Sequence, residues 1–397
     1  MKKIFAALCC LGLFAGLLPF SALAAQPTIN VYNWGQYISD GSDGCIDVNA
    51  EFTARTGIKV NYMTYDSNES LYTKLKTGGS TYDIIIPSDY MIARLISEGM
   101  LEKLDFDKIP NYKYVDDAYK NTAYDPDNAY SVPYTWGTVG VIYNSRYVDE
   151  ADIGSWDLLW NSKYSGKILM FDNPRDSFAI AEEYLGLGVN TENTDDLRAA
   201  AYKLIEQKPL VQSYVMDQIY DKMERGEAWI APYYAGDYLQ MAAVNPDLKF
   251  YLPSEGFNLF IDAVCIPKGC QNKEAAEAYI NFLCDPEISG QNLDYLGYST
   301  PISEAKQYMS PETAESEIAY PSKEVLARGA SYINLSSATS QEMDSLWLQV
   351  KTQGGVDNYA IWCMAVLAAG MAVYFLVRGV KRKRRIANRC QKWKDGA

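Results

Sequence analysis

The sequence predicts an α/β protein of two lobes that is exported from the cytoplasm and carries a C-terminal transmembrane helix. Three observations lead to this expectation. Strand-like and helix-like segments alternate along most of the 397 residues, which is typical of mostly parallel sheets covered by helices on both faces. An apolar leader opens the chain. A second apolar run, without charges, lies near its end.

The leader and the second apolar run define the expected topology. Residues 1–24 are predicted to be a signal peptide, because two lysines precede an apolar stretch that ends in a small-residue cleavage motif; an uncleaved signal anchor is the alternative. Residues 358–378 are predicted to be a transmembrane helix, since an uncharged run of this length spans a bilayer at about 1.5 Å per residue. The basic segment 379–397 should then remain cytoplasmic, and no nucleic-acid partner is needed to explain it.

The first lobe is expected to comprise residues 28–135 and 257–301. Its strands are predicted in "TINVY", "IKVNYMTY" and "YDIIIP". Helices are predicted between them, one ending near Gly57, one in "NESLYTKLKTG" and one in "SDYMIARLISEGM" with Ser88 or Asp89 as its N-cap. The long β-type run "YSVPYTWGTVGVIYN" contains Pro and Gly, which suits a crossing from one lobe to the other.

The second lobe is expected to comprise residues 136–256 and 302–352. Here "GKILMF" leads into the helix-like "DNPRDSFAIAEEYLGLG", and "EAWIAPYY" leads into "AGDYLQMAA". The strand "FNLFIDAVCIP" and the helix "NKEAAEAYINFLCDP" then return the chain to the first lobe.

The composition excludes several kinds of chemistry. The chain has 32 tyrosines and no histidine, which removes Ser-His-Asp and Cys-His catalysis and the commonest ligand of transition metals. We therefore expect no catalytic residues, no metal and no cofactor. The chain has 50 acidic and 36 basic residues, and many of the basic ones lie in the two ends, so the exported part is strongly acidic. Its cysteines, Cys45, Cys265, Cys270 and Cys284, could be thiols or form a disulfide.

The residues that follow predicted strands are aromatic or acidic, and ligands of open α/β sheets bind beyond the carboxyl ends of strands. An alkyl chain with ammonium groups needs aromatic faces for its methylenes and carboxylates for its charges. Ser88, Asp176 and Asp237 could instead act only at helix N-termini, whereas a carboxylate within an apolar strand is costly without a partner. The candidate ligand-binding residues are Trp34, Tyr37, Ser88, Tyr90, Asp176, Tyr234, Asp237, Phe260, Asp262 and Tyr298.

Several stretches together resemble the spermidine/putrescine-binding proteins of bacterial ABC transporters: "VYNWGQY", "TYDSNESLYTKLKTGGSTYDIIIPSDYMIARL", "APYYAGDY", "FIDAVCIPKG" and "LGYSTP". The resemblance implies a two-lobe periplasmic-binding-protein fold with hinge crossovers that closes on a polyamine. It also implies that Trp34 stacks along the ligand stem, that Tyr37 offers its hydroxyl to the polyamine, and that Asp176 and Asp262 hold amines. Tyr234 and Phe260 stand where the family usually has Trp, and a C-terminal membrane anchor is unusual for it.

The expected function is capture of a polyamine outside the cytoplasm and delivery to an ABC permease and its ATPase, by a monomer that performs no chemistry. One alternative is a receptor of the same fold for another small cationic solute or a metal complex. Another is a glycosidase using Asp176 and Asp262. A third is a polyamine sensor that signals through the basic tail.

Overall fold

The structure is a computed structural model that describes residues 26–78 and 81–352. The described residues form two compact units. Unit 1 consists of residues up to 135, residues 262–296 and residues 300–310; unit 2 consists of residues 136–261, residues 297–299 and the chain from residue 311. The two units share β4 (Ser131–Asn144) and β9 (Phe257–Cys265), which pass from one to the other.

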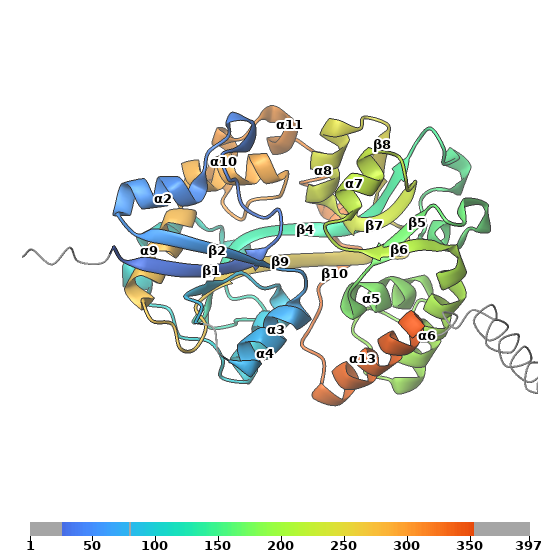
Figure 1. Ribbon diagram of the computed structural model, residues 1–397, viewed down its shortest axis with the longest axis horizontal. Coiled ribbons are helices and arrows are strands. Elements are labelled where there is room, and N and C mark those ends of the chain that lie inside the picture. The colour runs from blue at the N-terminus through green and yellow to red at the C-terminus, as the bar shows by residue number, and fades with distance from the viewer. Residues whose placement is uncertain (1–25, 79–80, 353–397) are drawn as a thin grey trace, which may run out of the picture. The chain divides into compact units, whose positions relative to one another are not determined.

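Unit 1 is a sheet with helices on both faces. Strand β1 pairs in parallel with β2 and β3, and β3 pairs with β9 in the antiparallel direction. Figure 1 shows α2 and α10 over one face of this sheet, and α3 and α4 over the other. The elements of unit 1, besides its parts of β4 and β9, are β1 (Thr28–Trp34), α2 (Val48–Thr56), β2 (Lys59–Tyr65), α3 (Asn68–Thr77), β3 (Ile84–Ile85), α4 (Asp89–Ser97), α9 (Lys273–Leu283) and α10 (Pro286–Leu296).

Unit 2 has a similar construction. Strand β5 pairs in parallel with β6 and β7, and β4 pairs with β7 and β8 in the antiparallel direction. Helices α7 and α8 lie over one face, and α5, α6 and α13 over the other (Figure 1). The elements are β5 (Ile168–Phe171), α5 (Pro174–Tyr184), α6 (Thr194–Gln207), β6 (Val211–Val215), α7 (Ile219–Glu224), β7 (Ile230–Tyr234), α8 (Ala235–Val244), β8 (Leu248–Tyr251), α11 (Pro311–Ala314), α12 (Lys323–Leu326), β10 (Gly329–Ala330) and α13 (Ser337–Thr352).

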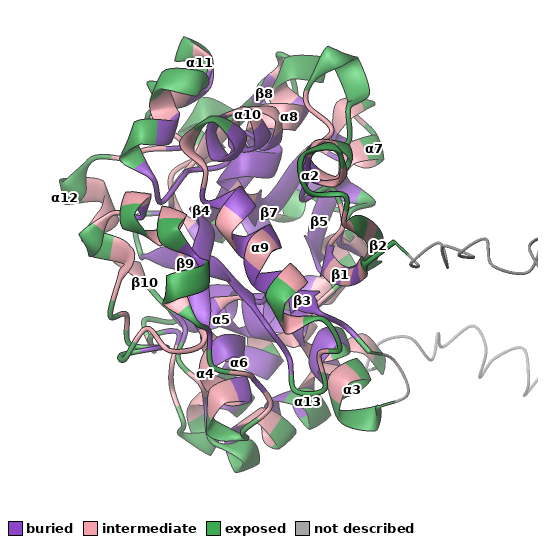
Figure 2. Ribbon diagram, turned by 90° about the vertical axis from the view of Figure 1, so that its left-hand side faces the viewer, coloured by how far each residue is buried: buried purple, intermediate pink, exposed green. Residues whose placement is uncertain are grey.

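Local sequence signals explain where several helices begin and end. Asp47 accepts a hydrogen bond from the backbone of Ala50 and so caps α2, and Gly57 ends it with φ at 73°, a left-handed conformation that glycine adopts without steric cost. In unit 2, Asn173 caps α5, and Pro174 occupies its first turn. All residues of β4 are buried, and Figure 2 shows buried strands beneath helices with exposed outer faces.

The prediction of an α/β fold with mostly parallel strands is confirmed, and antiparallel pairs occur beside the parallel ones. The parallel pairs join the strands that are connected by helices, as expected for such crossovers. The antiparallel pairs all involve β4 or β9. These two strands carry the chain from one unit to the other, and a strand that is buried along its whole length, as β4 is, carries no sequence signal for its direction.

The boundaries of the units differ from the expected lobes in three short segments. Residues 297–299, expected in the first lobe, belong to unit 2. Residues 302–310, expected in the second lobe, belong to unit 1, because the backbone and hydroxyl groups of Ser303 donate to the carboxylate of Asp116. Residues 257–261, expected in the first lobe, belong to unit 2, because the start of β9 pairs with β10.

The last described helix is fixed to unit 2. Helix α13 packs against α5 and α6. At its end, the Lys351 ammonium pairs with Asp172 at 2.5 Å, and the Lys208 ammonium donates to the Lys351 carbonyl at 2.6 Å. The lysine at the carbonyl end of the helix also complements the helix dipole.

The predictions for the two ends of the chain concern residues that the structure does not describe. The expected signal peptide 1–24, transmembrane helix 358–378 and tail 379–397 lie outside the described residues. A search of residues 26–78 and 81–352 finds no helix with the length and apolar character needed to cross a membrane. Cys45, Cys265, Cys270 and Cys284 are all free thiols in the structure.

Candidate ligand-binding site

In unit 1, Trp34 stands at the end of β1 with its indole half-buried. Its Nε1 donates to the carbonyl oxygen of Ile86 at 2.9 Å, and the Tyr65 hydroxyl donates to the same oxygen at 2.6 Å. The two rings lie 4.7 Å apart at a tilt of 50°. The indole is therefore held by its polar edge and is not packed into the core as a purely apolar side chain.

Tyr37 and Asp262, which are 225 residues apart in sequence, are in direct contact. The Tyr37 hydroxyl donates to Oδ2 of Asp262 at 2.6 Å, and both residues are buried. The Tyr134 hydroxyl donates to the Tyr37 carbonyl at 2.9 Å and so fixes the turn after β1. On the other side, Asp262 forms a backbone bridge with Ser88.

Ser88 and Tyr90, at the start of α4, are joined by Asn68 from the start of α3. The Asn68 amide donates to the Ser88 hydroxyl at 3.0 Å and to the Tyr90 hydroxyl at 3.1 Å. The Tyr90 hydroxyl in turn donates to Glu69 at 2.9 Å. Ser88 holds the N-cap position of α4, but its side chain makes no capping hydrogen bond to the helix. Its hydroxyl accepts a hydrogen bond from the Asn68 amide instead.

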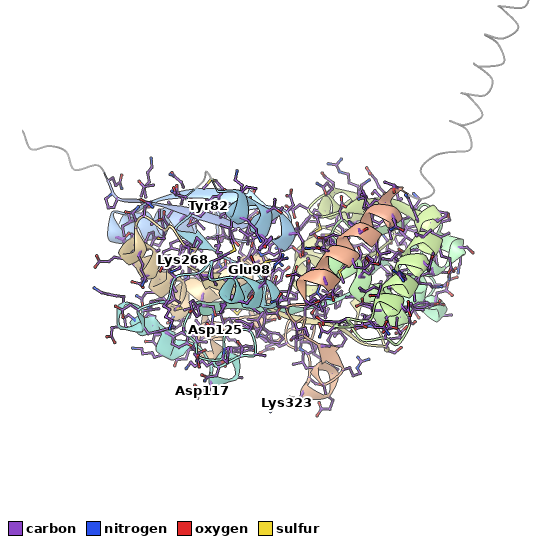
Figure 3. The ribbon with its side chains drawn as sticks, turned by 90° about the horizontal axis from the view of Figure 1, so that it is seen from below. Tyr82, Glu98, Asp117, Asp125, Lys268 and Lys323 are labelled. Atoms are coloured by element: carbon purple, nitrogen blue, oxygen red, sulfur yellow. The ribbon has the colours of Figure 1, made fainter. Side chains whose placement is uncertain are left out.

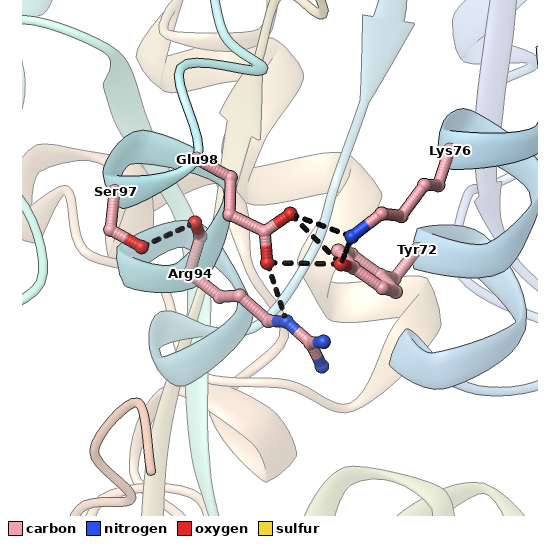
Figure 4. Close-up of polar contacts among 5 residues, drawn as sticks. All are labelled: Tyr72, Lys76, Arg94, Ser97 and Glu98. Carbon is pink, nitrogen blue, oxygen red and sulfur yellow. Dashed lines mark hydrogen bonds and ion pairs between the residues drawn. The ribbon is translucent and has the colours of Figure 1, made fainter. Parts of the chain in front are cut away.

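A polar cluster at the far ends of α3 and α4 holds these two helices together (Figure 4). The Tyr72 hydroxyl donates to both Glu98 oxygens at 2.9 and 2.8 Å, and Lys76 and Arg94 each pair with Glu98 at 3.2 Å. The Arg94 guanidinium lies 3.7 Å from the Tyr72 ring centroid. Since α3 begins at Asn68 and α4 just after Ser88, this cluster helps to fix the contact between their N-termini.

In unit 2, Asp176 lies in the first turn of α5 and receives three side-chain hydrogen bonds. The Asn173 amide and the Tyr234 hydroxyl donate to Oδ2, each at 2.8 Å, and the Tyr332 hydroxyl donates to Oδ1 at 3.0 Å. Burial raises the pKa of Asp176 above its usual value, while these hydrogen bonds and the charge of Arg175 oppose the shift.

Asp237 lies in the first turn of α8 and has two tyrosine donors. The Tyr220 hydroxyl donates to Oδ1 at 2.5 Å and the Tyr298 hydroxyl to Oδ2 at 2.6 Å. Burial raises the pKa of Asp237 to about 6 against these two hydrogen bonds, and repulsion from Asp217 adds to the increase. Gly236 is needed for this arrangement, because a Cβ there would lie 2.2 Å from the Tyr298 ring.

Phe260 connects the surroundings of the two unit 2 carboxylates. Its ring meets Tyr234 edge-on at 5.4 Å and Tyr298 at 6.4 Å. Gly137 leaves the space that the Phe260 ring occupies, since a Cβ there would come within 2.8 Å of it. One aromatic residue thus contacts a donor of Asp176 and a donor of Asp237.

The three predicted acids share one property. Asp176, Asp237 and Asp262 are 7%, 7% and 4% exposed, and each accepts at least one tyrosine hydroxyl. Within residues 26–78 and 81–352, neither Asp176 nor Asp237 forms an ion pair with lysine or arginine. Hydroxyl donors stabilise a carboxylate without cancelling its charge, so these two sites retain a negative charge that a cationic ligand can neutralise.

The structure distributes the ten candidate residues evenly between the units. Trp34, Tyr37, Ser88, Tyr90 and Asp262 lie in unit 1, and Asp176, Tyr234, Asp237, Phe260 and Tyr298 lie in unit 2. Direct contacts join Tyr37 to Asp262, Tyr234 to Asp176 and Tyr298 to Asp237. Their roles as ligand contacts stay predictions.

The sequence analysis missed three side chains that serve these residues: Asn68, Tyr220 and Tyr332. A signal for Tyr220 was present, because it follows β6, a strand parallel to β5, and residues after parallel strands gather at one edge. Tyr332 lies in a segment without regular structure, and no local pattern indicates its contact with Asp176.

Comparison with known proteins gives a consistent result. A family model for bacterial extracellular solute-binding proteins matches residues 48–321. The spermidine/putrescine-binding periplasmic protein of Escherichia coli is 33% identical over 333 residues, which cover 83% of this chain and 94% of that protein. A putrescine-binding periplasmic protein of Pseudomonas aeruginosa is 32% identical and is covered over 99% of its length.

Solved structures agree with this similarity. A putative spermidine/putrescine ABC transporter protein from Listeria monocytogenes superposes with a TM-score of 0.78 at 36% identity, covering 82% of this chain and 99% of that one. The predicted resemblance to polyamine-binding proteins and the predicted two-lobe fold are therefore confirmed. So is the expectation of a solute-binding protein rather than an enzyme. The chain belongs to the family of bacterial extracellular solute-binding proteins.

Proposed function

We propose that this protein binds polyamines such as putrescine and spermidine outside the cytoplasm and delivers them to an ABC permease with its ATPase. The observation that carries the proposal is that Asp176 and Asp237 are buried and accept tyrosine hydroxyls, without an ion pair to lysine or arginine in the part of the chain that the structure describes. The names of its relatives support the same ligand class. Glycoside hydrolysis by Asp176 and Asp262 is set aside, since the family binds solutes.

The proposed contacts divide by chemistry. The carboxylates of Asp176, Asp237 and Asp262 would each hold an ammonium group by charge-assisted hydrogen bonds. Trp34 and Phe260 would lie against the methylene stem, where cation–π attraction adds about 0.5–2 kcal/mol for a desolvated ammonium. The remaining candidates, Tyr37, Ser88, Tyr90, Tyr234 and Tyr298, would orient these groups or donate hydroxyls.

Isothermal titration calorimetry on the full chain in mild detergent tests the proposal. Putrescine and spermidine should bind, and 1,4-butanediol, which has the same carbon chain without charge, should not. Asp262→Asn keeps the shape but removes the charge, and should weaken binding tenfold or more. Asp117→Asn is the matched control, because the Asp117 side chain is 99% exposed on unit 1 (Figure 3).

The absence of heat with both polyamines would refute the proposal. A thermal-shift screen of other small cations and metal complexes would then identify the ligand class, since a ligand of the folded state raises the melting temperature.

The membrane anchor belongs to the same proposal. Segment 358–378 would hold the protein at the outer face of the cell membrane, with residues 379–397 on the cytoplasmic side. Membrane fractionation tests this topology. The full chain should resist extraction at alkaline pH, whereas a chain that stops after residue 356 should be recovered in the soluble fraction. Recovery of both in the soluble fraction would exclude the anchor.

A further inference from the structure

Asn190 binds the segment that follows β10 in unit 2. The amide of Asn190, from the loop after α5, donates to the Ser331 carbonyl at 2.9 Å, and its Oδ1 accepts from the Ile333 backbone at 3.0 Å. Asn190 therefore binds the residues on both sides of Tyr332. The Ser331 hydroxyl adds a further bond, to the Leu259 carbonyl at 2.8 Å, so the backbone around Tyr332 is held at several points.

Arg175 contacts both Asn190 and the Tyr332 ring. The Arg175 guanidinium donates to the Val189 carbonyl at 2.7 Å and to Oδ1 of Asn190 at 2.8 Å. Its Cζ lies 4.2 Å from the centroid of the Tyr332 ring. Arg175 is 4% exposed, so the planar guanidinium is held between fixed acceptors and an aromatic face.

These contacts hold the Tyr332 hydroxyl against the Asp176 carboxylate. The Tyr332 hydroxyl donates to Oδ1 of Asp176, the oxygen that neither Asn173 nor Tyr234 contacts. Burial raises the pKa of Tyr332 well above its usual value, so the hydroxyl keeps its proton and acts as a donor. A buried arginine and a partly exposed asparagine thus support a single hydrogen bond to the proposed site.

We infer that Tyr332, held by Arg175 and Asn190, is a positioning residue that orients the Asp176 carboxylate for an ammonium group. This inference rests on the proposed function for the identity of the ligand. Oδ2 already accepts from Asn173 and Tyr234, whereas Oδ1 accepts from Tyr332, so Oδ1 keeps acceptor capacity for an ammonium group. Without Tyr332, Oδ1 would lose the donor that fixes it, and the buried carboxylate would ionise less readily.

A ligand-free experiment tests the positioning. The groups that face Asp176 are Asn173 and Arg175 of α5, Tyr233 and Tyr234 of β7, and Tyr332. Melting temperatures of the full chain are measured for wild type and Tyr332→Phe from pH 4.5 to pH 8. Loss of the donor penalises the ionised carboxylate more than the neutral acid. The difference in melting temperature between the variant and wild type should therefore grow as the pH rises through the raised pKa of Asp176.

Tyr251→Phe is the matched control, because the Tyr251 hydroxyl in unit 2 donates to a neutral acceptor, the Ser155 carbonyl at 2.8 Å. Its difference from wild type should not change with pH. A Tyr332→Phe difference that is equally independent of pH would overturn the inference, since a purely structural tyrosine would behave in this way.

Titration with putrescine and spermidine supplies the second readout. Tyr332→Phe should weaken both by about tenfold at pH 7.5, which corresponds to about 1.4 kcal/mol, and Tyr251→Phe should stay within twofold of wild type. Unchanged affinity in Tyr332→Phe would overturn the inference. If wild type binds neither polyamine while the melting difference still grows with pH, the proposed function fails and the positioning of Asp176 stands.

Discussion

The affinity for polyamines should fall in mild acid, because Asp237 has a pKa of about 6. The amines themselves stay protonated throughout this range, like a lysine side chain. Their attraction to this carboxylate therefore follows its ionisation alone. The groups around Asp237 are Tyr220 of α7, Tyr298, Tyr233 of β7 and the acid Asp217. Burial raises the pKa of Tyr220 and of Tyr233 well above the usual value, so these two hydroxyls stay protonated near pH 6.

The magnitude follows from that pKa. At pH 5 only about one Asp237 side chain in eleven is ionised, and at pH 7.5 nearly all are, so the affinity should fall about tenfold between these values. The sign is fixed by the direction of the shift. Burial favours the neutral acid, and a bound ammonium favours the carboxylate, so binding near pH 6 must release protons.

Calorimetry from pH 5 to pH 8, in buffers of different ionisation enthalpy, measures both the affinity and the released protons. Asp237→Asn is the decisive variant, since it removes this titrating group and should reduce the pH dependence of the affinity between pH 5 and pH 7, while the raised pKa of Asp176 accounts for the part that remains. An affinity in wild type that does not change over this range would refute the reasoning. A profile that keeps its slope in Asp237→Asn would refute it as well.

Three further outcomes are expected. Tyr37→Phe removes the hydroxyl that donates to Asp262 at 2.6 Å; a hydrogen bond to a charged group contributes about 1.5–3 kcal/mol, so calorimetry should show putrescine affinity reduced tenfold or more. Gly236→Ala places a methyl group 2.2 Å from the Tyr298 ring and should lower stability in urea by about 1–3 kcal/mol. Glu182 is fully buried with a pKa raised to about 7 by burial, so urea melts should show stability falling by at most about 3 kcal/mol as the pH rises from 4.5 through 7, and Glu182→Gln should reduce this dependence.

Each of these outcomes has a control or a refuting result. Tyr279→Phe, which removes a buried hydroxyl bonded to Asn49 in unit 1, should bind putrescine like wild type. A stable Gly236→Ala variant would show that the Tyr298 ring can move without cost. Stability that is equal at pH 5 and pH 8, in wild type and Glu182→Gln alike, would contradict a buried neutral carboxyl at that position.

The acids that the structure shows buried beneath tyrosine hydroxyls were easier to single out from the sequence than the groups that serve them, and their role in binding stays a prediction. Asp262 could be found because a carboxylate within an apolar strand must have a partner, and Asp176 and Asp237 because they follow strands of a predicted sheet. Tyr332 could not be found, since its contact with Asp176 spans 156 residues and starts from an irregular segment. Contacts of that kind depend on the packing of the whole unit.

For the fold, too, local elements were predictable from the sequence and long-range pairings were not. The periodicity of apolar residues predicted the strands and helices of each crossover, and most of these elements are present. The direction of β4 and β9 and the assignment of residues 302–310 were not predictable in this way. Both depend on which neighbours a segment pairs with, and a uniformly buried strand such as β4 has no pattern that distinguishes one neighbour from another.

The attachment of α13 also determines how this molecule would respond to mechanical load. Because Lys351 is paired with Asp172 and its carbonyl with Lys208, a tension applied beyond Thr352 is transmitted first into β5, β6 and α6 of unit 2. A fluorophore, a tether for force spectroscopy or a fused domain placed after this helix would therefore report on unit 2. Unit 1 would need a label of its own.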